Sequence, residues 1–106
     1  MNTSFAASVS ALQVTQTRQN VVAHDVANIN TDGFSESKVI QKEMSPSGVS
    51  VADIRKTPNT SPTGYSNTDL AEESKEMIVN KKTYSANAAV IKTQDRMMGE
   101  LINLVA

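Results

Sequence analysis

The chain has 106 residues, enough for one small domain, and only 4% of them are aromatic. Ten basic and eleven acidic residues are intermixed and give a net charge of −1, so no basic patch indicates nucleic-acid binding. Cysteine is absent, which excludes disulfides and thiolate metal sites, and no apolar run reaches the roughly eighteen residues of a membrane-spanning helix.

The first predicted element is a helix over residues 3–28. Its apolar side chains recur near one face at helical spacing, although the polar run QVTQTRQN interrupts them. Because a helix with an interrupted stripe is marginal alone, we expect it to need a partner. The stripe consists of Phe5, Val9, Leu12, Val22, Val26 and Ile29.

Residues 28–33 form the most turn-prone cluster of the chain. Asn28 and Asn30 are placed to cap the first helix, and Gly33 can take up the positive φ with which a chain leaves a helix. We therefore expect a sharp helix exit here.

The middle of the chain predicts a β-hairpin followed by a linker. In residues 35–56, Val49 and Val51 alternate with Ser50 and Ala52, and SPSG between the two runs supplies turn residues. Residues 57–67 are rich in Pro, Gly, Ser and Thr and have neither helical nor strand periodicity.

The strongest pattern predicts one long helix over about residues 70–104. Asp69 is an N-cap residue, and Glu72, three positions later, has the place of a capping-box partner. Gly99 is the only glycine in this stretch and proline is absent. Glu72, Glu73 and Glu76 are interpreted as a solvated first turn that the helix dipole favours, in preference to a metal cluster.

This second helix has apolar residues at a strict seven-residue interval, which predicts coiled-coil packing on another helix. A second apolar stripe near its C-terminus indicates that several chains surround that end. Asn87, in the helix interior, is either an interhelical hydrogen-bonding residue that fixes the register or simply exposed. The assembly residues predicted on this helix are Leu70, Met77, Tyr84, Asn87, Ile91, Met98, Leu101, Ile102 and Val105.

These elements predict a mainly α fold. Two long helices pair as an antiparallel, coiled-coil-like core, and a short β-hairpin with a loop connects them. Residues 1–30 and 69–106 form the helical core domain, and residues 31–68 form the connector. Because large side chains are scarce, we expect other chains to complete the buried surface. No nucleophile–base pair, metal-ligand set or phosphate loop is recognisable, so we expect no enzymatic activity, cofactor or metal ion.

Both ends of the chain carry a recognisable motif. The stretch RQNVVAHDVANINTDGF near the start is similar to the N-terminal motif of the flagellar rod and hook proteins, which typically reads N-V-x-A-N-N-I-A-N-x-N-T-x-G-F/Y. SNTDLAEESKEMIVNKKTYSANAAVIKTQDRMMGELINL resembles their C-terminal motif. The usual Asn-Asn pair is His24-Asp25 here, and Asp32 replaces the common proline before Gly33.

The resemblance implies a structural axial subunit of the bacterial flagellar basal body, rod or rod-like, that assembles through helix packing and transmits torque. The implied partners are other flagellar axial proteins, with copies of the same chain left open, and the flagellar type III export apparatus. The start MNTSFAASVSAL lacks the features of a Sec signal, so we expect the type III apparatus to export the chain to the periplasmic rod. The alternative is a soluble adaptor or regulator that keeps the rod-protein core and binds a flagellar assembly or export component.

Overall fold

A computed structural model of the chain describes residues 2–60 and 63–105. Helix α1 (Asn2–Ala27) is followed by strands β1 (Ser37–Glu43) and β2 (Val49–Lys56) and by helix α2 (Leu70–Val105). The two long helices, with a hairpin between them in the chain order, confirm the predicted fold class.

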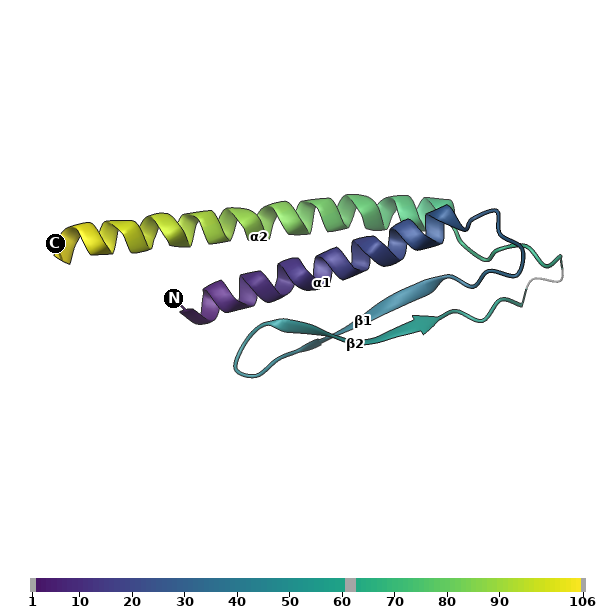
Figure 1. Cartoon of the computed structure of the whole chain (residues 1–106), viewed down its shortest axis with the longest axis horizontal. Helices are drawn as coiled ribbons and strands as arrows, with labels where there is room; N and C mark the ends of the chain where they lie inside the picture. The colour runs from purple at the N-terminus through teal and green to yellow at the C-terminus, as the bar shows by residue number, and fades with distance from the viewer. Residues whose placement is uncertain (1, 61–62, 106) are drawn as a thin grey trace.

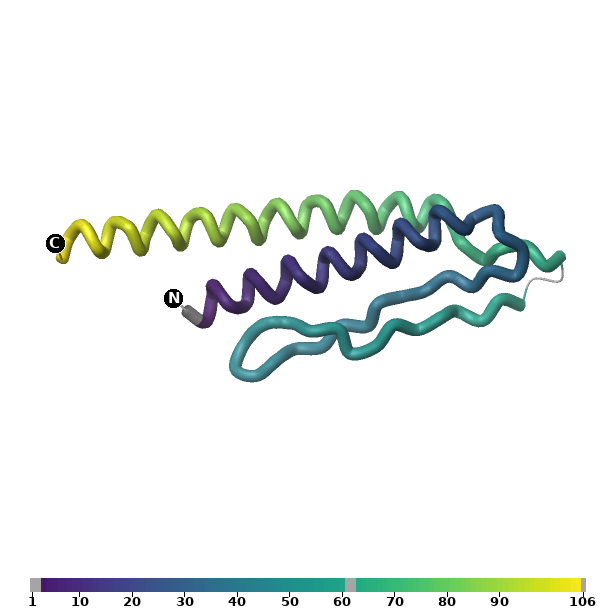
Figure 2. Tube along the Cα trace, viewed as in Figure 1, coloured from purple at the N-terminus to yellow at the C-terminus, as the bar shows by residue number. Residues whose placement is uncertain are grey.

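The elements lie in three layers, with α1 between α2 and the hairpin (Figure 1). The two helices run antiparallel, and they lie closest where the chain leaves α1 and enters α2. The molecule measures 69 × 24 × 14 Å. Helix α2, with 36 residues and therefore about 54 Å long, makes up most of its length, and it runs well past the N-terminus of α1 (Figure 2). The C-terminal part of α2 therefore has no part of α1 beside it.

Helix α1 is covered on two sides, and small residues make this possible. Ser8, Ser10, Val14, Thr15 and Val22 are all buried. Small side chains on a middle helix let the backbones on both sides approach closely. Val14 and Thr15, within the run that interrupts the apolar stripe, thus belong to a packed surface, whereas Gln13, Gln16 and Asn20 are exposed. Val14 and Val22 are the only buried hydrophobic residues in the described part of the chain, so its apolar core is small.

The hairpin is antiparallel, with Ser37 opposite Lys56 and a bulge after Ile40. Its turn is closed by a hydrogen bond of 2.9 Å from Met44 N to Gly48 O, which confirms the turn expected from SPSG. The turn also lies against α1, since a Cβ atom on Gly48 would come within 2.8 Å of the Ser10 hydroxyl oxygen.

Hydrogen bonds hold the hairpin to α1. Ser10 Oγ accepts from Val49 N at 3.1 Å and donates to the Ala7 carbonyl at 2.7 Å. Two turns further along α1, Arg18 donates to Gln41 Oε1 of β1 at 2.9 Å and to Glu76 Oε2 of α2 at 2.6 Å. One arginine therefore joins all three layers.

Candidate functional site

The face of α2 that packs against α1 is polar. Glu73 and Asn80 are almost fully buried there, with 1% and 2% of their surface exposed. Asn87 and Gln94 continue the row at seven-residue spacing and are half-buried. Asn80 Nδ2 donates across the interface to Gln19 Oε1 at 3.2 Å. The hydrogen bond between amide side chains of the two helices is thus made by Asn80, one heptad before Asn87. Asn87 Nδ2 instead donates to the Thr83 carbonyl, one turn earlier in its own helix.

We call the row of Glu73, Asn80, Asn87 and Gln94 the polar seam. The apolar row of α2, whose members also recur every seven residues, lies beside this seam and is largely exposed. Ile91 is the one member that is half-buried. The described part of the chain therefore leaves most of the predicted assembly row uncovered. Its exposed members, together with the two C-terminal residues predicted beside it, are Leu70, Met77, Tyr84, Met98, Leu101, Ile102 and Val105.

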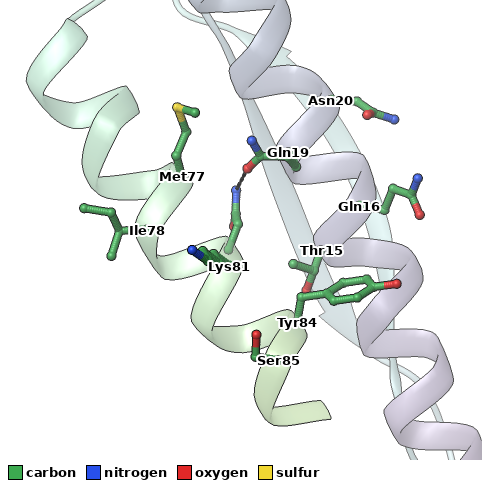
Figure 3. Close-up of a pocket in the computed structure, with 10 residues that line it drawn as sticks. Thr15, Gln16, Gln19, Asn20, Met77, Ile78, Lys81, Tyr84 and Ser85 are labelled. Atoms are coloured by element: carbon green, nitrogen blue, oxygen red, sulfur yellow. Dashed lines mark hydrogen bonds between the residues drawn. The ribbon is translucent and has the colours of Figure 1, made fainter. Parts of the chain in front are cut away.

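A groove of about 660 Å³ runs between the two helices and includes part of this row (Figure 3). Met77, Ile78 and Tyr84 are the apolar and aromatic residues of α2 that line it. Gln16 and Gln19 line it from α1. The groove is thus a place where apolar side chains of α2 meet amide side chains of α1 at the surface.

The apolar residues predicted on α1 are only partly covered. Val22 is buried and Phe5 is 46% exposed. The remaining members are half-buried: Val9, Leu12, Val26 and Ile29. The N-terminal end of α1, with its exposed Phe5, lies at the same end of the molecule as the C-terminal end of α2 (Figure 1).

Among the residues that the structure describes, the most exposed large apolar side chains lie on the overhang of α2. Ile102 is 63% exposed, and Leu104 and Val105 are more than 80% exposed. Residues of this kind cluster on a soluble protein mainly where another molecule covers them.

The helix exit lies in the predicted segment. Asn28 Nδ2 donates to the His24 carbonyl at 2.9 Å, and Asn28 Oδ1 accepts from Thr31 Oγ1 at 3.1 Å. Asn30 is exposed. Gly33 has a φ of 72°, and its N–H donates to a carbonyl of the linker at 2.6 Å.

The start of α2 is capped by Asp69. Its Oδ1 accepts hydrogen bonds from Ala71 N at 3.0 Å and from Glu72 N at 3.4 Å. The Glu72 carboxylate contacts Lys38 Nζ at 2.8 Å and so links the first turn of α2 to β1.

Three carboxylates meet where α1 ends, β1 begins and α2 begins. Asp25, Glu36 and Glu73 are 0%, 7% and 1% exposed, and each offers an oxygen within 4.8 Å of the others. Ser37 N donates to Asp25 Oδ1 at 3.1 Å, and Lys38 Nζ lies 3.5 Å from Glu73 Oε1. The interpretation of Glu73 as part of a solvated first turn is therefore wrong, because the connector folds back over it.

Burial changes the proton affinities in this cluster. Loss of solvation raises the pKa of Asp25 and of Glu73 above their ordinary values, and the mutual repulsion of the two groups adds to the rise for Glu73. Burial lowers the pKa of Lys38, but its hydrogen bond to Glu72 and the neighbouring carboxylates outweigh this, so the net shift is upward.

The sequence analysis missed this cluster, although two signals for it were present. Asp25 stands where the rod and hook motif has asparagine, so an acid replaces an amide. Glu73 is also in seven-residue register with Asn80, Asn87 and Gln94, which places it on their face of α2.

Within residues 2–60 and 63–105, neither helix contains a stretch long and apolar enough to cross a lipid bilayer. Two features stand out in the described residues. One is the exposed apolar surface of α2, which includes its C-terminal overhang, and the other is the buried acidic cluster at the end of the molecule opposite that overhang.

Two family descriptions match this chain. The family "Flagella basal body rod protein" matches residues 5–34, and "Flagellar basal body rod FlgEFG protein C-terminal" matches residues 64–104. The two matched segments are essentially α1 with its exit and α2 with its cap. Residues 35–63, the central part of the connector, lie between the two matched segments.

Curated relatives include the flagellar hook protein FlgE of Escherichia coli (strain K12), of Salmonella typhimurium (strain LT2) and of Salmonella typhi. Each is 49% identical to this chain over 39 residues, which is 37% of the chain. The match covers 10% of each relative, so this chain aligns with about a tenth of the length of the hook proteins.

Proposed function

We propose that this chain, a member of the flagellar rod and hook family, is an axial structural subunit of the flagellar basal body. Its residues 5–34 match the flagellar basal body rod protein family, and its residues 64–104 match the C-terminal family of the rod proteins. In this role it is a rod or rod-like strut, and it has no enzymatic function. Its helices carry torque through their contacts with neighbouring subunits.

The observation that supports this proposal is the division of α2 into two rows. The polar row faces α1 within the chain, whereas the apolar row and the overhang stay exposed. Exposed apolar surface at coiled-coil spacing is stabilised when helices of neighbouring chains cover it. Among the described residues, Val14 and Val22 are the only buried hydrophobic ones, so assembly would supply most of the apolar burial.

The proposed partners are other axial proteins of the flagellum, with copies of the same chain as an alternative at the same surface. We further propose that the flagellar type III export apparatus carries the chain to the periplasmic rod.

A point substitution on the overhang tests the assembly surface. Ile102 is exposed, so Ile102→Asp leaves the fold of the isolated chain intact. In an assembled rod the same aspartate would be buried without a partner, which costs several kcal/mol. Asn103→Asp is the matched control, because it adds the same charge at the neighbouring exposed position.

Both variants are expressed in cells that lack the wild-type gene, and the exported fraction and purified basal bodies are probed. We expect both to be exported and only Asn103→Asp to be incorporated. Incorporation of Ile102→Asp at the wild-type level would show that the overhang is not the assembly surface. Absence of the wild-type chain itself from basal bodies would favour the adaptor or regulator.

A further inference from the structure

The acidic cluster has more negative charge than its own lysine neutralises. Asp25, Glu36 and Glu73 supply three carboxylates, and Lys38 supplies one ammonium group within 4.0 Å of two of them. Ionised groups so close together and so little exposed repel strongly, because water does not screen them. A cation among their oxygens would remove this repulsion.

Glu36 gives an independent sign that such a cation is accommodated. Its residue is 7% exposed and its side chain 10% exposed, and Oε2 is buried without a hydrogen-bond partner. The nearest cation is Lys38 Nζ at 4.0 Å, but that group is drawn to Glu72 Oε1 at 2.8 Å. A buried carboxylate oxygen without a hydrogen bond is costly unless something else solvates it.

We infer that Asp25, Glu36 and Glu73 form a binding site for a divalent cation, and that Ca²⁺ is the ion that fits best. The site offers only oxygen ligands, which is the chemistry that Ca²⁺ prefers. Its oxygens lie within 4.8 Å of one another, which is no farther apart than two opposite ligands at about 2.4 Å from a Ca²⁺ ion. Mg²⁺ demands a smaller, near-octahedral shell, which three carboxylates from separate elements are less suited to form.

Lys38 does not block this site. Its ammonium group contacts Glu72 Oε1 at 2.8 Å, and the Glu72 side chain is 48% exposed, so the two side chains have room to move together away from the three carboxylates. Lys38 therefore weakens cation binding by repulsion, and removing its charge should tighten the binding.

Bound Ca²⁺ would join three elements at one point, since Asp25 lies near the end of α1, Glu36 directly before β1 and Glu73 in the first turn of α2. It would fix the helix exit and the return of the chain, far from the apolar overhang. The cation site and the assembly surface are thus separate features, and a test on the purified chain can fail for one without affecting the other.

The experiment is calorimetric titration of the purified full chain with CaCl₂ and with MgCl₂ after treatment with EDTA, together with thermal unfolding. We expect saturable binding of one Ca²⁺ per chain below about 1 mM, within the range of weak structural sites, weaker binding of Mg²⁺, and a rise of several degrees in Tm with Ca²⁺. Asp25→Asn keeps an acceptor for Ser37 N and should abolish binding, as should Glu36→Gln.

The matched control is Glu100→Gln, which removes one carboxylate from an exposed position of α2 and should leave binding unchanged. Lys38→Gln should bind Ca²⁺ more tightly than the wild type. Absence of saturable Ca²⁺ binding up to about 5 mM, above the range of extracellular calcium modules, would overturn the inference. Equal binding by the wild type and by a folded Asp25→Asn or Glu36→Gln variant would overturn it as well.

Discussion

The contact between the hairpin turn and α1 can be tested with a single methyl group. Gly48 has a φ of 105°, and an added Cβ would lie 2.8 Å from Ser10 Oγ and 3.1 Å from Met44 Cε. A left-handed backbone costs an alanine about 1–2 kcal/mol. Displacing Ser10 Oγ leaves Val49 N without its acceptor, which costs about 1–3 kcal/mol. Gly48→Ala should therefore reduce the free energy of unfolding by about 2–5 kcal/mol.

Two other glycines separate these contributions. Gly33 has a φ of 72° and open space around its Cβ position, so Gly33→Ala should cost only the backbone strain. Gly99 lies within α2 with nothing near its Cβ position, and Gly99→Ala should stabilise the protein by about 1 kcal/mol. Thermal unfolding followed by circular dichroism measures all three, with about 4–8 °C in Tm for each kcal/mol. If Gly48→Ala loses no more stability than Gly33→Ala, the turn does not pack on Ser10.

Two further predictions concern the polar face of α2. Asn80→Ala should reduce the free energy of unfolding by about 1–3 kcal/mol in denaturant melts, because it removes a buried interhelical bond. The matched variant Asn87→Ala should change it by less than about 0.5 kcal/mol, since its bond stays within α2 and alanine favours the helix; equal losses would contradict the polar seam. In EDTA, burial raises the pKa of Asp25 and of Glu73, so the folded chain holds protons that the unfolded chain releases. Their contribution to stability is therefore present below their ordinary values of 3.8 and 4.5 and is lost as the pH rises through the folded values. The Tm difference between the wild type and Asp25→Asn should become less favourable to the wild type across this window, and a pH-independent difference would show that Asp25 does not titrate abnormally.

The order and length of the elements could be predicted from local patterns. Asp69 before an uninterrupted helical run fixes where α2 starts, and Gly48 closes the hairpin turn because of its positive φ. Both effects depend on residues within a few positions of one another. The sequence is therefore sufficient for the helices, the hairpin and the family motifs at the two ends.

Which row of α2 faces α1 was decided only by the tertiary structure. A seven-residue repeat occurs on α2 twice, once in apolar residues such as Met77 and Tyr84 and once in Glu73 and Asn80. Apolar character alone favours the first row, but the structure buries the second, where Asn80 meets Gln19. The acidic cluster was hidden for the same reason, because its members are far apart in the chain. Local sequence determines that a helix forms, whereas long-range contacts determine which of its faces is covered by its own chain and which is left for another.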